Sequence, residues 1–290
     1  MTLRPPIDFS PPEAPPRGGF RGIDSPADRF LLGAMEEAAR TAGEFQLSEF
    51  RGHPPGWGDI KGGHEFVSFV DLESEKRIRV ILDQALPGAA FYGEETEKSR
   101  GEYTWIVDPL DGTTNYLSGY DCWSVSIALW ERDAPSLGLV LRPCTGELFT
   151  ALRGGGAYRN GTRLPAAEPL APASALIATG TPYRSPDTVD AFFATVRRVL
   201  EKCRDIRRNG SAALDLCWIA AGYFQGFWEA DLQPYDVAAG ILMLSETGHP
   251  CRSFSGAAYD PFRHRSLVTA RPGVMEALEE AIRAGYGNMD

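Results

Sequence analysis

The chain has 290 residues, of which 43% are apolar and 23% charged, and its formal net charge at pH 7 is −10. The apolar share is enough for a sizeable core. The acidic balance argues against a general nucleic-acid-binding protein, because such a protein needs a basic face to neutralise phosphates. It leaves room for a small phosphorylated ligand, since bound divalent cations can reverse the charge of a local site.

Five cysteines and four histidines are scattered along the chain, with no C-x-x-C or H-x-x-x-H pair. Reduced thiols therefore fit better than a disulfide framework or a zinc site. Prolines interrupt the N-terminal residues where a signal peptide needs an unbroken apolar stretch, and no apolar run is long enough to span a membrane. We expect a cytoplasmic protein with no nucleic-acid or membrane partner.

The first predicted elements are helical. Residues 1–24 contain six prolines and favour a flexible tail. A helix is expected from Ser25, a good N-cap residue that is followed by Pro26 at the first helical position. A second helix is expected to follow Asp71, through the segment LESEKRIRVILDQAL.

Extended segments then replace the helical pattern. Turn residues separate the expected strands AAFYGEE, YTWIVD, CWSVSIALWE, SLGLVL, ELFTAL and GAYRNG. From residue 172 strands (ALIATG, GFWEAD, SLVTA) alternate with helices (DTVDAFFATVRRVLEKC, SAALDLCWIAAG, YDVAAGILMLSETG, GVMEALEEAIRAG). These patterns predict two mixed α and β halves, residues 25–171 and 172–290, packed as layers.

Two carboxylates stand where the apolar run 105–107 ends. Asp108 would lie at the carboxyl end of a buried strand, where open α/β sheets commonly present ligands. Asp111 follows three residues later, and Gly112 lets the main chain approach whatever the aspartates hold. A turn in which the aspartates only cap backbone amides is the alternative.

Polar side chains that favour helix starts come next, Thr113, Thr114 and Asn115, and the free amides of a helix start can hold a phosphate.

Two further acidic positions extend this pattern. Glu94 and Glu95 follow the strand before Asp108, and Asp236 opens an apolar helix. If these carboxylates converge, each pair at 4 Å repels by about 4 kcal/mol at an effective dielectric of 20. Mg²⁺, with its preference for oxygen ligands, would relieve that repulsion.

The sequence resembles the inositol monophosphatase family, within the lithium-sensitive, magnesium-dependent phosphatase superfamily. The matching segments are GEE (93–95), DPLDGTTNY (108–116), SVSIAL (124–129), ELFTALRGGGAYRNG (147–161), GSAALDLCWIAAGYFQGFWE (210–229) and PYDVAAG (234–240). The resemblance implies a layered α/β/α/β/α sandwich of the inositol monophosphatase/fructose-1,6-bisphosphatase type, a homodimer and sensitivity to lithium.

The resemblance also implies a metal site for two to three Mg²⁺ ions. Glu94, Asp108 and the carbonyl of Leu110 would bind the first ion. Asp108, Asp111 and Asp236 would bind the second. A weaker third ion would lie near Glu95 and Asp71.

Catalytic and substrate roles follow from the same resemblance. Thr113, hydrogen-bonded to Glu94, would orient and help deprotonate the attacking water. The amides of Gly112 and Thr113 would hold the phosphate, with Thr114 also binding substrate. The substrate hydroxyls would face Asp111, Ala212, Glu229 and Asp236.

Some features depart from the family pattern or admit two interpretations. Tyr235 stands where Trp is usual, and the segment 61–71, with Lys61 and His64-Glu65, is one residue short. The basic cluster Arg204, Arg207 and Arg208 indicates a solvated face or subunit contact rather than anion recognition. Phe224, Phe227 and Trp228 indicate core rather than a binding surface.

The leading hypothesis is a Mg²⁺-dependent phosphomonoesterase acting on a small polyol phosphate, with myo-inositol 1-phosphate first among the substrates. A histidinol phosphatase, or another sugar or nucleotide phosphatase of the superfamily, is the alternative within the same chemistry. A regulatory or binding protein that keeps the fold is the alternative from another class.

Overall fold

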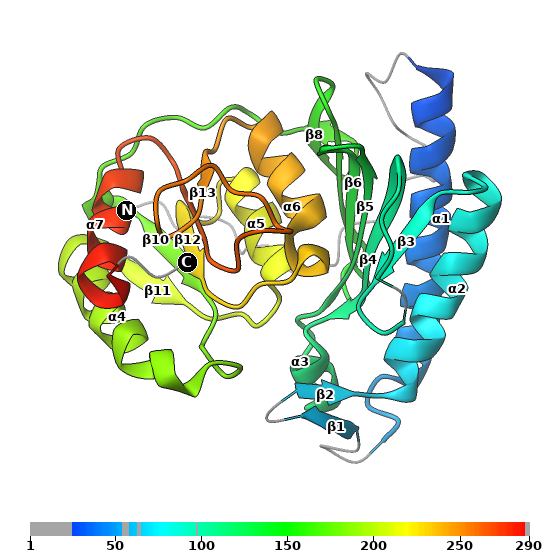
Figure 1. The fold of residues 1–290 in the computed structure, drawn as a ribbon, viewed down its shortest axis with the longest axis horizontal. Coiled ribbons are helices and arrows are strands. Elements are labelled where there is room, and N and C mark those ends of the chain that lie inside the picture. The colour runs from blue at the N-terminus through cyan, green and yellow to red at the C-terminus, as the bar shows by residue number, and fades with distance from the viewer. Residues whose placement is uncertain (1–24, 54–57, 63–64, 97, 288–290) are drawn as a thin grey trace, which may run out of the picture.

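A computed structural model describes residues 25–53, 58–62, 65–96 and 98–287, so the predicted tail 1–24, Pro54 to Trp57, His64 and the last three residues lie outside the described part. The elements stack in five layers, which confirms the predicted sandwich (Figure 1). Two helices cover a seven-stranded sheet, two more lie between that sheet and a five-stranded one, and a third pair covers the far side.

The first layer consists of α1 (Pro26–Glu49) and α2 (Phe69–Ala85). Ser25 caps α1 as predicted, because its side chain accepts a hydrogen bond from the Asp28 amide. The second helix starts earlier than expected: Ser68 is its N-cap, and Asp71 lies inside the first turn, where it completes a capping box with Ser68. The free amides of a first turn stabilise a carboxylate, which is why the helix includes Asp71 instead of starting after it.

The second layer is a sheet in sequential order, β3-β4-β5-β6-β7-β8-β9, in which only β3 and β4 run parallel. Its strands are β3 (Ala90–Gly93), β4 (Tyr103–Asp111), β5 (Ser124–Glu131), β6 (Ala134–Arg142), β7 (Glu147–Leu152), β8 (Gly156–Arg159) and β9 (Thr162–Arg163). Six of these were predicted, and β9 is too short to show a pattern. The short helix α3 (Thr113–Leu117) and the hairpin β1 (Asp59–Gly62) and β2 (Glu65–Val67) lie below this sheet (Figure 1).

The central layer holds α5 (Ala212–Ala220) and α6 (Pro234–Glu246). Residues 234–244 of α6 are all buried, as expected for a helix that is apolar all round. Close backbone approach fixes this helix against β6, since a Cβ on Gly138 would lie 3.1 Å from the Ala239 carbonyl oxygen. Helix α6 of the predicted half 172–290 therefore packs on the seven-stranded sheet of the half 25–171. The division of the chain at residue 171 stays a prediction.

The fourth layer is a five-stranded sheet in the order β11-β10-β12-β14-β13, flanked on its outer face by α4 (Val189–Lys202) and α7 (Met275–Tyr286). Its strands are β10 (Leu176–Thr179), β11 (Asp205–Arg207), β12 (Gly226–Glu229), β13 (Cys251–Arg252) and β14 (Leu267–Ala270), and short 3₁₀ turns span Pro172–Ser174 and Pro186–Thr188. Phe227 and Trp228 are fully buried and Phe224 packs at the edge of the core, as predicted. β11 and β13 were not predicted, because both are short and polar.

Across the described part of the chain, no helix is both long and apolar enough to cross a membrane.

Candidate active site

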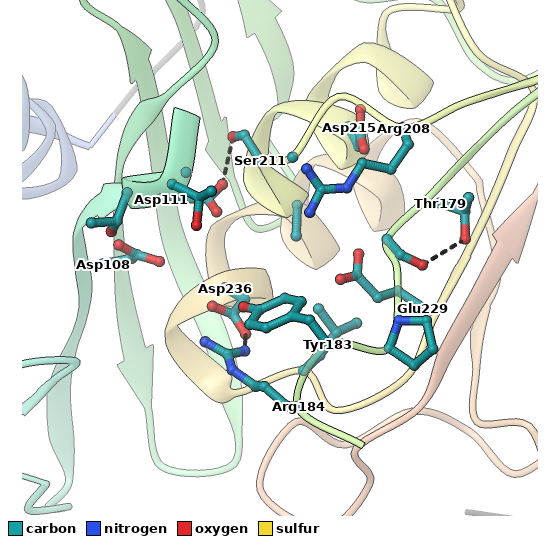
Figure 2. A pocket seen from close by; sticks show the side chains of 18 of the residues that line it. Asp108, Asp111, Thr179, Tyr183, Arg184, Arg208, Ser211, Asp215, Glu229 and Asp236 are labelled. Carbon is teal, nitrogen blue, oxygen red and sulfur yellow. Dashed lines mark hydrogen bonds and ion pairs between the residues drawn. The ribbon is translucent and has the colours of Figure 1, made fainter. Parts of the chain in front are cut away.

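A cavity of about 570 Å³ opens between the two sheets (Figure 2). Segments far apart in the sequence line it: the end of β3, the end of β4 with the start of α3, the segment after β10, the start of α5, the end of β12 and the start of α6. Ten of the twelve predicted site residues lie in its wall: Glu94, Asp108, Leu110, Asp111, Gly112, Thr113, Thr114, Ala212, Glu229 and Asp236. Two predicted residues, Asp71 and Glu95, are not in the wall.

The turn after β4 is shaped by an irregular strand register. Asp108 pairs with Ser126 and Asp111 with Ser124, so β4 has one extra residue there and bulges. The Leu110 amide donates to Asp108 Oδ1 at 3.0 Å, which fixes the carboxylate at the bulge. Gly112 follows at φ +103°, and a Cβ there would lie 3.0 Å from the Cys122 carbonyl oxygen, so only glycine fits.

Asp111 is tied to the start of α5. Its Oδ2 accepts hydrogen bonds from Ser211 Oγ at 2.6 Å and from the Ala213 amide at 2.8 Å. Burial raises the pKa of Asp111 to about 7, helped by repulsion from Asp236 and opposed by the two hydrogen bonds. The Ser124 hydroxyl also contacts Oδ2, at 3.4 Å, and together these contacts hold the carboxylate where it lines the cavity.

Asp108 shows that the carboxylates converge. Burial raises its pKa well above the usual range, and repulsion adds to this effect, most from Glu94, then from Asp111 and then from Asp236. The family resemblance implied this convergence of three distant segments, and the structure brings them to one cavity. Among the described residues, no three acidic, histidine or cysteine side chains lie close enough together to coordinate one metal ion.

The donor set nevertheless fits a hard divalent cation. All the groups are oxygens, and their mutual repulsion is what a bound cation would relieve.

Asp236 is positioned by the first turn of α6. It is the third residue of that helix, and its Oδ2 accepts from the Gln233 amide at 2.6 Å. The same oxygen lies 3.8 Å from Arg184 Nη1, an ion pair that the sequence did not predict. The start of α6 therefore directs a carboxylate into the cavity, as expected (Figure 2).

The acceptor of Thr113 differs from the expected one. Its hydroxyl lies 2.9 Å from Asp71 Oδ1 and 3.1 Å from the Leu110 carbonyl oxygen, and Asp71 takes the place predicted for Glu94. Asp71 is fully buried, and its other oxygen accepts from the Ser68 amide and hydroxyl. The reason is the early start of α2, which brings its first turn against the end of β4.

Glu95 is held through its backbone by a residue that sequence reasoning missed. The Glu95 amide donates to Glu75 Oε2 at 2.9 Å, and the Thr96 hydroxyl donates to Glu75 Oε1. Glu75 is 1% exposed and lies one helical turn after Asp71 on α2. That i, i+4 spacing of acidic residues was the available signal.

The far wall of the cavity also contains residues that were not predicted as site residues. Asp215 and Arg208 lie there with Glu229, and Tyr183 and Arg184 lie on the segment after β10 (Figure 2). Burial raises the pKa of Glu229 well above its usual range, and repulsion from Asp236 and Asp215 adds to the effect. Arg208 is exposed, as expected for a solvated face, and it also lines this cavity, which the sequence did not predict.

A sequence model of the inositol monophosphatase family matches residues 28–285. The chain belongs to the inositol monophosphatase family. This confirms the resemblance, and members of the family are generally metal-dependent phosphatases with small phosphorylated substrates.

Relatives from this family carry two kinds of name. The inositol-1-monophosphatase of Rhizobium meliloti (strain 1021) is 39% identical over 257 residues, which cover 87% of this chain and 96% of that protein. Nus factor SuhB of Haemophilus influenzae is 34% identical over 261 residues, or 89% and 97% of the two chains. The solved structure of the extragenic suppressor protein suhB from Bartonella henselae gives a TM-score of 0.83 at 36% identity, covering 88% of this chain and 99% of that one.

Within this family pattern, Tyr235 is a buried residue next to Asp236, 6% exposed, with Lys98 Nζ 5.3 Å from its ring centre. It does not line the cavity. The side chain of Lys61 lies outside the described part of the structure, so its predicted role stays a prediction.

Proposed function

We propose that this protein is a Mg²⁺-dependent phosphomonoesterase that releases inorganic phosphate from a small polyol phosphate, with myo-inositol 1-phosphate as the leading substrate. The observation that carries the proposal is the convergence of Glu94, Asp108, Asp111 and Asp236 on one cavity, where burial and mutual repulsion raise the pKa of Asp108. The relative named inositol-1-monophosphatase supports the choice of substrate.

The proposed metal ligands are the predicted ones: Glu94, Asp108 and the Leu110 carbonyl for one ion, Asp108, Asp111 and Asp236 for another. Glu95 and Asp71 would lie near a third. Bound Mg²⁺ supplies an activated water and charge stabilisation for the leaving oxygen.

The protein groups around the reacting atoms position the partners. Thr113 donates its hydroxyl hydrogen bond to Asp71, so its oxygen lone pairs are free to accept a hydrogen bond from the attacking water and hold it in line. If the hydroxyl took that water's proton, its own proton would pass to Asp71. Gly112 and Thr113 would donate their amides to the phosphate oxygens, with Thr114 beside them. Positioning and neutralisation are the main work that phosphoryl transfer leaves to a protein.

The rest of the cavity would bind the alcohol. Glu229 and Asp236 accept hydrogen bonds from substrate hydroxyls, and Ala212 leaves room beside Asp111. Gly180 also serves this pocket, because a Cβ on it would overlap the Glu229 carboxyl group.

Phosphate release from myo-inositol 1-phosphate tests the proposal. We expect turnover with Mg²⁺, none in excess EDTA, recovery when Mg²⁺ is restored, and inhibition by Ca²⁺, whose looser geometry suits in-line attack poorly. Full turnover in EDTA would refute the metal site. Histidinol phosphate, fructose 1,6-bisphosphate and adenosine 3′,5′-bisphosphate are the comparison substrates, and a wide preference for histidinol phosphate would refute the inositol assignment alone.

A second candidate, a regulatory or binding protein, has one observation in its favour: relatives such as the Haemophilus influenzae protein are named Nus factor SuhB. The discriminating variant is Asp111→Asn. If phosphatase activity is lost while a cellular phenotype persists, the second role is supported.

The resemblance also supports a cytoplasmic homodimer and inhibition by lithium as proposals. Cell fractionation tests the cytoplasmic location, sedimentation of the purified protein tests the homodimer, and a lithium titration of activity tests the inhibition.

A further inference from the structure

The wall of the cavity facing the carboxylate turn carries a guanidinium group that the described residues do not hold. Arg208 lies between β11 and α5 and lines the cavity, and Figure 2 shows its guanidinium directed inward. The side chain is exposed, and within the described part of the chain no hydrogen bond or ion pair holds it. Its five N–H donors are therefore available to a ligand.

Three hydrogen bonds hold the residues that follow Arg208. The Asn209 carbonyl accepts from Asn115 Nδ2 at 2.8 Å, and Asn209 Nδ2 donates to Asp215 Oδ1 at 2.7 Å. Ser211 Oγ donates to Asp111 Oδ2 at 2.6 Å. The segment is thus tied to the same turn that carries the carboxylates, so the Arg208 side chain starts from a defined position.

Glycine at position 210 makes room for this side chain. Gly210 has φ +86°, and a Cβ there would lie 2.6 Å from Arg208 Nη1. The guanidinium therefore rests over the Gly210 backbone, and a larger residue at 210 would displace it.

The neighbouring arginine shows that this placement is not shared by the whole basic cluster. Arg207 Nη1 pairs with Asp205 Oδ2 at 2.6 Å on the exposed surface, and Arg207 does not line the cavity. Arg207 and Arg208 are therefore identical neighbours of which only Arg208 lines the cavity, and Arg207 is a matched control for Arg208.

Arg208 faces two carboxyl groups across the alcohol end of the cavity. Asp215 is 1% exposed, and Arg208 partly offsets the burial that raises the pKa of both Asp215 and Glu229. A fork of donors opposite two acceptors complements hydroxyl groups, because each hydroxyl both donates and accepts. A phosphate ester whose aromatic or alkyl group carries no further hydroxyl would leave Arg208 and the two carboxyl groups without hydrogen-bond partners.

We propose that Arg208 is a specificity-determining residue that donates hydrogen bonds to hydroxyl oxygens of the substrate's alcohol, while Glu229 and Asp215 accept from those hydroxyls. The inference rests on the proposed phosphatase function and deepens it by naming Arg208 as the residue that would select a polyol over an alcohol with a single hydroxyl.

The test compares myo-inositol 1-phosphate with phenyl phosphate, an ester of similar ring size without hydroxyls. In Arg208→Met, which keeps the aliphatic stem, kcat/KM for the inositol ester should fall about 10- to 100-fold, mainly through KM, since charge-assisted hydrogen bonds are lost. Activity on phenyl phosphate should change less than about threefold. Arg207→Met should leave both substrates unaffected.

An equal loss on both esters, or no loss on either, would overturn the proposal. If the wild-type protein hydrolyses neither ester in Mg²⁺, the proposed phosphatase function has failed, and calorimetric titration with inositol 1-phosphate in Ca²⁺ decides the role of Arg208 by itself. Affinity at least about tenfold weaker in Arg208→Met than in wild type would support the contact. Equal affinity, or no binding by the wild type, would refute it.

Discussion

At the scale of single residues, the predicted carboxylates and their partners differ in how local their signals are. Asp108 and Asp111 lie in one contiguous motif, so the sequence alone identified them. The acceptor for Thr113 depends instead on which residue the first turn of α2 presents to the end of β4, and no local pattern shows that. Arg208 and Arg207 are adjacent, identical and both exposed, and only the fold places Arg208 at the cavity and Arg207 outside it.

Asp111→Asn separates the functional value of this carboxylate from its effect on stability. Burial raises the pKa of Asp111 from its ordinary value of 3.8 to about 7, so the native protein binds this proton more tightly than the unfolded chain. That stability is present below about pH 4 and is lost as the pH rises to about 7, by up to roughly 4 kcal/mol. Asn keeps one oxygen for Ser211 and Ala213 and carries no charge.

We therefore expect Asp111→Asn to abolish turnover yet to unfold at higher urea than wild type in EDTA at pH 7.5, with the gain shrinking at pH 4.5 and in Mg²⁺. Asp133→Asn, an exposed position, is the control. A variant that is less stable than wild type in EDTA at pH 7.5 would contradict the repulsion argument.

The Thr113–Asp71 pair should act as one unit. Thr113→Val removes the hydroxyl that the structure bonds to Asp71, and kcat should fall about 10²- to 10⁴-fold, as for loss of general-base assistance. Asp71→Asn should cost a similar factor, and the double variant should be no worse than either single one. Thr113→Ser, which keeps the hydroxyl, should retain most activity. Multiplicative losses in steady-state kinetics would show that the two residues act separately.

At the scale of elements, α2 organises both acidic segments of the site. Asp71 in its first turn holds the turn after β4 through Thr113, and Glu75 one turn later holds the segment after β3 through the amide of Glu95. Gly93 permits this contact, because a Cβ there would overlap the Glu75 carboxylate. The sequence pattern predicted a helix here but not its polar inner face, since buried acidic residues break the apolar period on which the prediction depended.

Removing Glu75 should weaken metal binding more than it affects the chemical step. In Glu75→Gln one acceptor oxygen becomes a donor facing the Glu95 amide or the Thr96 hydroxyl, so the segment carrying Glu94 should shift. The half-saturating Mg²⁺ concentration should rise about 10- to 100-fold, a typical effect for a residue that supports metal ligands, with kcat at saturating Mg²⁺ close to wild type.

Glu73→Gln is the matched control for Glu75→Gln, because Glu73 lies on the same helix and, among the described residues, pairs only with Lys76 and Arg77 at the surface. Calorimetric Mg²⁺ titration gives a readout independent of turnover. An unchanged Mg²⁺ affinity in Glu75→Gln would refute the positioning role.

At the scale of the whole molecule, periodicity predicted most of the strands and helices but not their stacking. Alternating patterns identified β3 to β8, and apolar periods identified α4 to α7. The five-layer order came from the family resemblance, because α6 packs on the sheet of the preceding half and no local signal shows that contact. β11 and β13 escaped prediction for the same reason, since only pairing with β10 and β14 makes such short polar segments into strands.

His249 should make the stability of the whole fold depend on acidity. It lies just beyond α6, is 4% exposed, and its Nδ1 shares a hydrogen bond with Thr247 Oγ1 at 2.9 Å. Burial, and to a smaller extent the charge of Arg271, lowers its pKa from 6.5 to about 4. The unfolded chain therefore binds the proton more tightly, so stability is complete above about pH 6.5 and falls as the pH drops towards 4, by roughly 3 kcal/mol.

Urea unfolding of the EDTA-treated protein between pH 7 and pH 4.5 measures this dependence, and His249→Gln supplies the comparison. Gln keeps a hydrogen-bonding group near Thr247 but does not titrate, so its free energy of unfolding should fall less than that of wild type over the same range, the difference being about 1.4 kcal/mol for each pH unit below 6. His264→Gln, a partly exposed site on another loop, should follow the wild-type curve. Parallel curves for wild type and His249→Gln would mean that the buried imidazole does not couple folding to pH, and the carboxylates of the cavity would then account for the pH dependence.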